Sequence, residues 1–154
     1  MPTPDANAST FESLYYDRWS KMVRLAALTT GSEAIAEEIV QEAFVQLLRN
    51  WATVHNPTLW LRIAVVNGCR GWVRHRVVER RHNTEATGTT EADHSVVIRD
   101  ALGRLSWRQR AAVVLRFYED LPEREIAEIL GCRPGTVKSL LDRAKTTLRK
   151  ELES

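Results

Sequence analysis

Apolar residues recur with the period of an α-helix along almost the whole chain, and this periodicity constrains the fold most. The clearest case lies between residues 32 and 51, where Ile35, Ile39, Ala43 and Leu47 follow one another every four residues. Such a stripe covers one face of an amphipathic helix. Val40, Phe44 and Leu48 lie beside it. No segment shows the alternation of a half-buried strand, so the sequence predicts an all-α fold.

Breaks in the helical pattern divide the chain into two small helical domains. Between residues 79 and 95 the only apolar residues are Ala86 and Ala92, and such a stretch cannot offset the entropy of ordering it. A hydroxyl of the segment Thr30-Gly31-Ser32 is expected to cap the helix at 32–51, and that of Thr58 is expected to cap the helix at 59–77. The expected organisation is a disordered N-terminus at 1–10, a first domain at 11–78, a flexible linker at 79–95 and a second domain at 96–152.

Composition and the lack of long apolar segments restrict the class of protein to which the chain can belong. The 154 residues are 44% apolar and 27% charged, with a net charge of +2, which is normal for a soluble globular protein. Since the sequence has neither an apolar signal segment nor a run of about 20 apolar residues, a cytoplasmic protein without membrane association is expected. Cys69 and Cys132 are interpreted as buried free thiols within helices. A zinc site from Cys69, His75 and His82 matches no usual spacing, so no metal or other cofactor is expected.

Charged residues are segregated along the chain. Residues 31–42 hold four glutamates and no basic residue, whereas residues 62–81 hold six arginines and one glutamate. This segregation predicts an acidic face and a basic face that suit different partners.

The strongest local signal is a helix-turn-helix that begins at Leu121. A short helix at 122–130 is followed by Gly131, which tolerates the positive φ of a tight turn, and by Pro134, which fits the first turn of a second helix. A second helix of this kind enters the major groove of DNA. Its expected buried positions are Val137, Leu141, Ala144 and Leu148, and its polar face, together with the preceding turn, shows Arg133, Thr136, Lys138, Ser139, Asp142, Arg143 and Lys145.

The segments Leu115-Arg-Phe-Tyr-Glu-Asp-Leu, Glu125-Ile-Ala-Glu-Ile-Leu-Gly and Gly135-Thr-Val-Lys-Ser resemble domain four of the extracytoplasmic-function (ECF) sigma factors. In that family this domain binds the upstream (minus thirty-five) promoter element as duplex DNA. The resemblance implies that the polar face just described contacts the upstream element. Arg133 departs from the family, whose members often have a serine-type cap there, and is expected to contact a phosphate instead.

The first domain extends the resemblance. Ala36-Glu-Glu-Ile-Val-Gln-Glu-Ala-Phe resembles the domain-two helix that clamps a coiled coil of the polymerase largest subunit. The resemblance implies that Glu38, Gln41, Glu42 and Arg49 bind core polymerase. Carboxylates and an amide suit charge-assisted bonds to arginines of a partner helix, although a solvated surface has the same composition.

The helix at 59–77 resembles the segment of the family that binds the downstream (minus ten) element, because it begins with Trp60-Leu61 and has Asn67 seven residues after Trp60. The resemblance implies that Asn67 contacts a flipped base. Arg70, Arg74, His75 and Arg76 would hold the opened strand, and Trp60 and Trp72 fit stacking or core positions equally. Val66 and Gly71 replace a basic residue and an aspartate. With Gly68, Gly71 weakens the helix by up to about 2 kcal/mol relative to alanine, so a bent or frayed helix is expected.

The resemblance covers roughly residues 11–150. It implies a sigma factor that is monomeric when free, performs no chemistry, binds core RNA polymerase through the coiled coil and the flap, and directs it to promoter DNA. Family members often bind an anti-sigma factor, but no residue here identifies one. The alternative is a stand-alone helix-turn-helix regulator of duplex DNA, which explains residues 121–149 but not the acidic face or the Asn67 segment. An enzyme is disfavoured, because no phosphate loop, catalytic triad or metal cluster is recognisable in the sequence.

Overall fold

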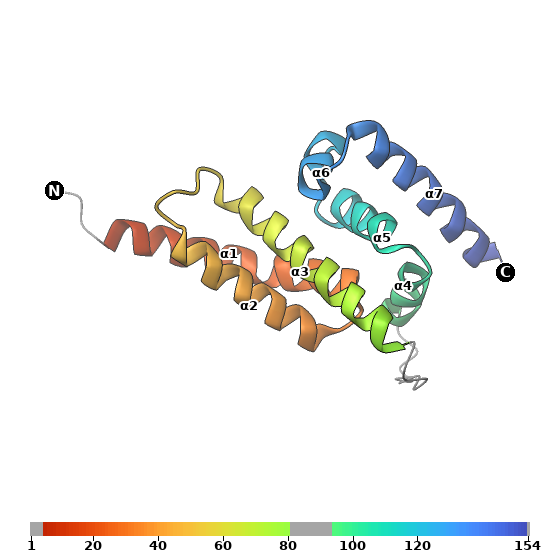
Figure 1. Ribbon diagram of the computed structural model, residues 1–154, viewed down its shortest axis with the longest axis horizontal. Helices are drawn as coiled ribbons and strands as arrows, with labels where there is room; N and C mark the ends of the chain where they lie inside the picture. Colours follow the sequence, from red (N-terminus) through yellow and green to blue (C-terminus); the bar gives the residue numbers. More distant parts are fainter. Residues whose placement is uncertain (1–4, 81–93, 154) are drawn as a thin grey trace.

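The computed structural model describes residues 5–80 and 94–153, with side chains described for 10–75 and 97–153. Within these ranges the chain is helical and has no strand, as predicted. Among these helices, none is long and apolar enough to cross a membrane. The first lobe contains α1 (Asp5–Thr30), α2 (Glu33–Arg49) and α3 (Pro57–Arg80), and the second lobe contains α4 (His94–Gly103), α5 (Trp107–Val113), the π-helix η1 (Val114–Tyr118), α6 (Glu123–Leu130) and α7 (Pro134–Glu153) (Figure 1).

The predicted helices are present, but several ends differ. α1 begins at Asp5, so the prediction of disorder is corrected for residues 5–10. α3 continues to Arg80 and α4 begins at His94, so both helices enter the segment predicted as a linker. The rest of that segment, 81–93, lies outside the described residues. An existing helix gains one hydrogen bond for each residue added, so its ends can pass beyond the apolar stripe.

Polar side chains cap the N-terminal ends of α2 and α3. A hydroxyl of the Thr30-Gly31-Ser32 segment caps α2 as predicted: that of Ser32 accepts a hydrogen bond from the backbone N–H of Ile35 at 3.3 Å. The cap predicted at Thr58 is wrong. Asn56 Oδ1 accepts from the N–H of Leu59 at 3.2 Å instead, because Pro57 already occupies the first helical position.

The core of the first lobe lies between α1, α2 and α3, and α1 packs most extensively on α2. Leu48 is 56% exposed, although its position beside the apolar stripe of α2 suggested burial. Phe11 of α1 packs edge-to-face against Trp51, which follows the end of α2, with the ring centroids 5.4 Å apart. The fully buried side chains of this lobe include Met22, Leu25, Val40, Leu47, Leu61 and Val65.

α3 is an uninterrupted helix from Pro57 to Arg80, so the predicted fraying at its glycines is wrong. At Gly68 a Cβ atom would lie 2.7 Å from Cγ2 of Ile39 on α2, whereas at Gly71 it would meet nothing within 4 Å. Gly68 therefore permits the close approach of α2 to α3, and this packing offsets its low helix propensity.

The helix-turn-helix forms as predicted. α6 ends at Gly131, whose φ is +68°, and the N–H of Cys132 donates to the carbonyl of Ala127 at 3.0 Å. This is a C-terminal arrangement that glycine favours. The side chains that join α6 to α7 are those expected: Ile126, Ala127, Leu130, Val137, Leu141 and Ala144 are buried, and Leu148 is half-buried.

The two lobes pack against each other in one continuous hydrophobic core. α3 lies beside α5 and α6, and α1 contacts α4, α5 and η1 (Figure 1). The sequence pattern predicted two domains but contained no sign of this mutual packing.

Candidate nucleic-acid and partner interfaces

The first candidate surface lies on α2 and comprises the predicted residues Glu38, Gln41, Glu42 and Arg49. All of these side chains are exposed, on the side of α2 away from its buried residues. Glu42 Oε1 accepts a hydrogen bond from Gln46 Nε2 at 2.9 Å, one helical turn further on. The α2 surface is therefore available to a partner without disturbing the core.

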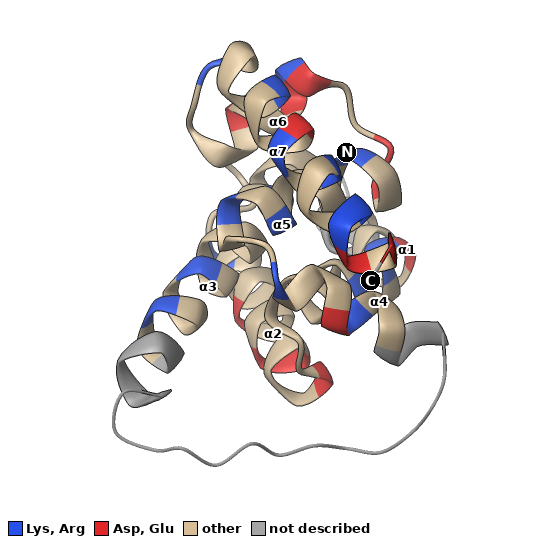
Figure 2. Cartoon of the chain, turned by 90° about the vertical axis from the view of Figure 1, so that its right-hand side faces the viewer, with Lys and Arg blue, Asp and Glu red and all other residues tan. Residues whose placement is uncertain are grey.

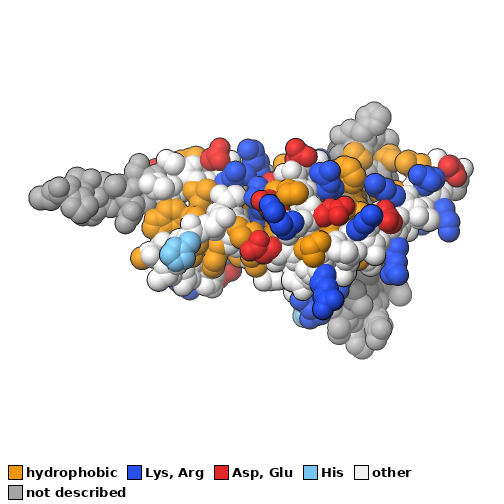
Figure 3. All heavy atoms as spheres, turned by 90° about the horizontal axis from the view of Figure 1, so that it is seen from above, with side chains coloured by type: hydrophobic (Ala, Val, Ile, Leu, Met, Phe, Trp, Pro, Cys, Tyr) orange, Lys and Arg blue, Asp and Glu red, His pale blue; other side chains and the backbone are white. Residues whose placement is uncertain are grey.

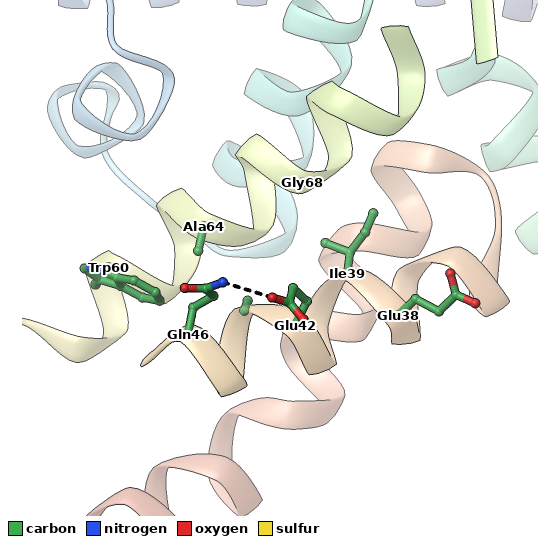
Figure 4. Close-up of a pocket in the computed structure, with 8 residues that line it drawn as sticks. Glu38, Ile39, Glu42, Gln46, Trp60, Ala64 and Gly68 are labelled. Carbon is green, nitrogen blue, oxygen red and sulfur yellow. Dashed lines mark hydrogen bonds between the residues drawn. The ribbon is translucent and has the colours of Figure 1, made fainter. Parts of the chain in front are cut away.

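A groove of about 440 Å³ adjoins the α2 surface, and it was not recognised from the sequence. Figure 4 shows Glu42 and Gln46 of α2 facing Trp60 and Ala64 of α3 across it. Its floor is apolar and its rim carries two carboxylates. Such a groove fits a partner helix that has both apolar and basic side chains. Its lining residues are Glu38, Ile39, Glu42, Ala43, Gln46, Trp60, Ala64 and Gly68.

The second candidate surface lies on α3. Trp60, Asn67 and Arg74 are spaced by seven residues, so they share one face of the helix. Asn67 and Arg74 are exposed and Trp60 is half-buried. His75, next to Arg74, is also exposed.

A second hollow, of about 370 Å³, lies where the α2–α3 loop meets this face of α3. Because it forms between a loop and a helix, the sequence pattern contained no signal for it. Its lining residues are Asn50, Thr53, Val54, His55, Asn56, Leu59, Trp60 and Ile63.

Two other predicted residues of α3, Trp72 and Arg70, are half-buried and are not part of this exposed face. Trp72 is half-buried and lies on the same side of the helix as the core residues Leu61 and Val65. Arg70 is half-buried, with its guanidinium carbon 5.6 Å from the ring centroid of Trp107 in the second lobe. The side chain of Arg76 lies outside the described residues.

Charge is distributed between the helices as the sequence predicted. Figure 2 shows acidic positions along α2 and basic positions along α3. These two helices are neighbours in the first lobe, so an acidic and a basic surface lie next to each other.

The third candidate surface lies at the N-terminal end of α7. Its predicted residues Arg133, Thr136, Lys138, Ser139, Asp142, Arg143 and Lys145 are all exposed. The hydroxyl of Ser139 donates to the carbonyl of Gly135 at 3.2 Å, whereas the longer side chains extend into solvent. Seen from above, lysine and arginine side chains are frequent over the half of the molecule that contains the second lobe (Figure 3).

An exposed aromatic pair on η1 was also missed. The π-helix buries Leu115 and leaves Phe117 and Tyr118 exposed by 63% and 41%. Partial burial and the neighbouring Glu119 raise the pKa of Tyr118, and Arg24 opposes this rise. A π-helix adds a residue to the turn, so α-helical periodicity does not predict which side chains face outward.

His82, one of the three residues weighed for a zinc site, lies outside the described residues. Across the described ranges, no group of three or more potential metal ligands comes together. Cys69 is buried as predicted, and burial raises the pKa of its thiol to about 12. Cys132 is only half-buried and lies in the turn between α6 and α7, so its predicted burial within a helix is wrong.

Known proteins resemble this chain over most of its length. A family model described as Sigma-70, region 4, matches residues 95–148. The RNA polymerase sigma-E factor of Streptomyces avermitilis is 32% identical over 154 aligned positions, which cover 94% of this chain and 86% of that protein. The ECF RNA polymerase sigma factor SigL of Mycobacterium tuberculosis is 31% identical over 170 positions, covering 96% and 92%.

The fold has solved counterparts. A co-crystal structure of the sigma factor RpoE with the anti-sigma factor NepR from Bartonella quintana matches with a TM-score of 0.80 and 22% identity, over 94% of this chain and 97% of that one. This match shows the likeness of the fold, and the closer sequence relatives show the family. The chain belongs to the ECF family of RNA polymerase sigma factors, proteins of transcription initiation.

Proposed function

We propose that this sigma factor binds core RNA polymerase through α2, contacts the upstream promoter element as duplex DNA through α7, and contacts the downstream element as opened single strand through α3. The main support is that the residues implied on α2 and α7, together with Asn67 and Arg74 of α3, are exposed on helices whose apolar faces form the core. Binding can therefore use these surfaces without unfolding either lobe.

On α2, the polymerase partner is proposed to be the coiled coil of the largest subunit. Glu38 and Glu42 stand on the rim of the groove between α2 and α3, and Ile39 and Ala43 belong to its apolar lining. Carboxylates at such a rim make charge-assisted hydrogen bonds to arginines, while the apolar lining is available for side-chain packing. The flap is proposed as a second contact on the family resemblance alone.

On α7, Lys138, Ser139 and Arg143 lie on the exposed side of the second helix of a helix-turn-helix. The N-terminal part of such a helix contacts base edges in the major groove, and a bidentate arginine commonly pairs with guanine. Arg133, just before α7, is proposed to contact a phosphate.

On α3, Asn67 lies in line with Trp60, which also lines the hollow beside the α2–α3 loop. Unpaired bases stack on aromatic rings, and extruded bases are held in pockets lined by polar and aromatic groups. The hollow beside Trp60 supports binding of an opened strand, and Arg74 and His75, further along α3, are proposed to contact its backbone.

The protein is proposed to be monomeric when free and to catalyse no reaction itself. Its structural neighbour from Bartonella quintana is bound to an anti-sigma factor. We propose that this chain is also controlled by an anti-sigma factor, and the basis for this is the likeness to that complex.

Transcription from a cognate promoter by bacterial core polymerase, with and without the chain, tests the proposal. Run-off transcript is expected only when the chain is present, and permanganate should then detect an opened bubble. The free chain, with a net charge of +2, is expected to bind duplex DNA weakly, with a Kd of about 10⁻⁴–10⁻⁶ M. Nanomolar, site-specific binding by the chain alone, with no bubble when core is added, would instead show a stand-alone regulator.

A further inference from the structure

One acidic residue lies on the face of α7 that is proposed to enter the major groove. From residue 133 to residue 150 the chain holds six basic residues and a single acidic one, Asp142. Its side chain is exposed, one turn after Lys138 and Ser139, and points away from the buried residues of α7. A carboxylate in this position repels DNA phosphates, so it lowers the affinity that the basic residues around it supply.

The carboxylate of Asp142 does not stabilise α7. The residue lies near the middle of the helix (Pro134–Glu153), whereas the helix dipole stabilises a negative charge only in the first turn. Within the described part of the chain no basic side chain forms an ion pair with it, although Lys138 and Lys145 lie about one turn away on either side. Aspartate is also a poorer helix former than alanine. The stability of the fold therefore does not explain this charge.

The hydroxyl groups next to Asp142 are bonded to the backbone of α7. The hydroxyl of Ser139 donates to the carbonyl of Gly135 at 3.2 Å, and that of Thr146 donates to the backbone carbonyl of Asp142 itself at 3.1 Å. Neither hydroxyl is used by the carboxylate. The carboxylate oxygens of Asp142 therefore face solvent, where a hydrogen-bond donor of a ligand can reach them.

We propose that Asp142 is a specificity-determining residue, whose carboxylate accepts a hydrogen bond from the N4 amino group of a cytosine in the upstream element. The only hydrogen-bond donors that bases present in the major groove are cytosine N4 and adenine N6. Adenine also presents the acceptor N7 beside N6, which repels a carboxylate, whereas cytosine presents no acceptor there. Guanine and thymine present acceptors and are rejected. This inference rests on the function proposed for α7 and adds the base that Asp142 selects.

The charges of α7 suit selection between sites more than tight binding to any one site. Basic residues attract the phosphates of every sequence, whereas Asp142 weakens binding wherever no amino group meets its carboxylate. The difference in affinity between correct and incorrect sites therefore increases. Arg143 follows Asp142 directly, and consecutive side chains of a helix point about 100° apart. The two residues are therefore expected to contact different bases.

Transcription by core polymerase and the full chain, from a promoter library with randomised upstream elements, tests the inference. Wild type is expected to prefer cytosine at one upstream position by about fivefold or more, and Asp142→Ala to lose this preference. Asp142→Asn should move the preference at the same position to adenine, because an amide binds N6 and N7 of that base. Asp100→Asn is the matched control, since it removes an exposed negative charge from α4 of the same lobe, and should leave every preference unchanged.

Selection of randomised duplexes by the full chain alone, at low ionic strength, repeats the test without polymerase. The polar face of α7 is exposed in the free chain, so the same cytosine should be enriched. Asp142→Asn should also bind a duplex of random sequence about two- to threefold more tightly than wild type, because one repulsive charge is removed from the phosphates. Asp100→Asn should not show this gain.

An unchanged base preference in Asp142→Asn overturns the inference, as does a change of affinity that is equal for all upstream elements. A change confined to the position that Arg143→Ala also alters overturns it too, because Asp142 would then act by orienting Arg143. The melting temperature should be the same in all variants, since the side chain of Asp142 is exposed. Enrichment of cytosine in the selection, without transcription when core polymerase is added, would instead contradict the proposed function and leave the inference standing.

Discussion

Gly68 of α3 and Ile39 of α2 approach each other so closely that a Cβ atom on the glycine would lie 2.7 Å from the isoleucine Cγ2. Gly68→Ala is therefore expected to lower the free energy of unfolding by about 1–3 kcal/mol through overpacking, despite the higher helix propensity of alanine. Urea denaturation followed by circular dichroism measures the change.

Gly71 provides the matched control on the same helix, since a Cβ there would meet nothing within 4 Å. Gly71→Ala is expected to raise the free energy of unfolding by about 0.5–1 kcal/mol. Equal stabilisation by the two substitutions would contradict the packing role of Gly68.

Substitutions on the α2 surface are expected to weaken binding to core polymerase without lowering the stability of the fold. Replacing Glu38, Gln41 and Glu42 together with alanine should weaken binding to core polymerase by more than about 2 kcal/mol, because these groups would be desolvated against basic partners. The melting temperature should change little, since all three side chains are exposed. Affinity for core polymerase is measured directly, with Glu37→Ala as an exposed acidic control on the same helix. Unchanged affinity of the triple variant would rule out this surface as the polymerase contact.

Substitutions on the α7 surface are expected to cause two different defects in promoter binding. Arg143→Ala should cost about 1–3 kcal/mol at the preferred promoter and relax the preference at one upstream position, as expected for a base contact. Lys145→Ala should weaken all promoters about equally, as expected for a phosphate contact. Transcription from a library of promoters with randomised upstream elements distinguishes the two. An unchanged base preference in Arg143→Ala would mean that α7 enters the groove in another orientation.

The two cysteines should differ in reactivity. Burial raises the pKa of the Cys69 thiol to about 12, and Arg110 opposes this only in part, so almost none of it is thiolate at pH 8. Because the thiolate is the reacting species and Cys69 is also inaccessible, a disulfide reagent at pH 8 should modify Cys132 first. Denaturation should expose Cys69 to the reagent. Rapid modification of two thiols per native chain would contradict the burial of Cys69.

Some of the fold and of the candidate surfaces could be predicted because short segments determine them. Ser32 caps α2, Gly131 ends α6, and the stripe from Val137 to Ala144 faces inward, each through interactions with residues a few positions away. The exposed residues of α7 follow from the same periodicity. The exposure of Phe117 could not be predicted, because the π-helix departs from that period.

The sequence by itself determined the helices, the turn of the helix-turn-helix, the segregation of charge and the family, since all of these are expressed in local patterns. Only the tertiary structure decided how the lobes pack. Arg62 meets Glu119 across 57 residues of chain, and Arg110 meets Leu28 across 82. Gly68 shows the same difference between local and tertiary effects. Locally a glycine weakens a helix, whereas in the tertiary structure Gly68 makes room for Ile39 of α2. Helical periodicity specifies which face of each helix is apolar, but not which other helix covers it.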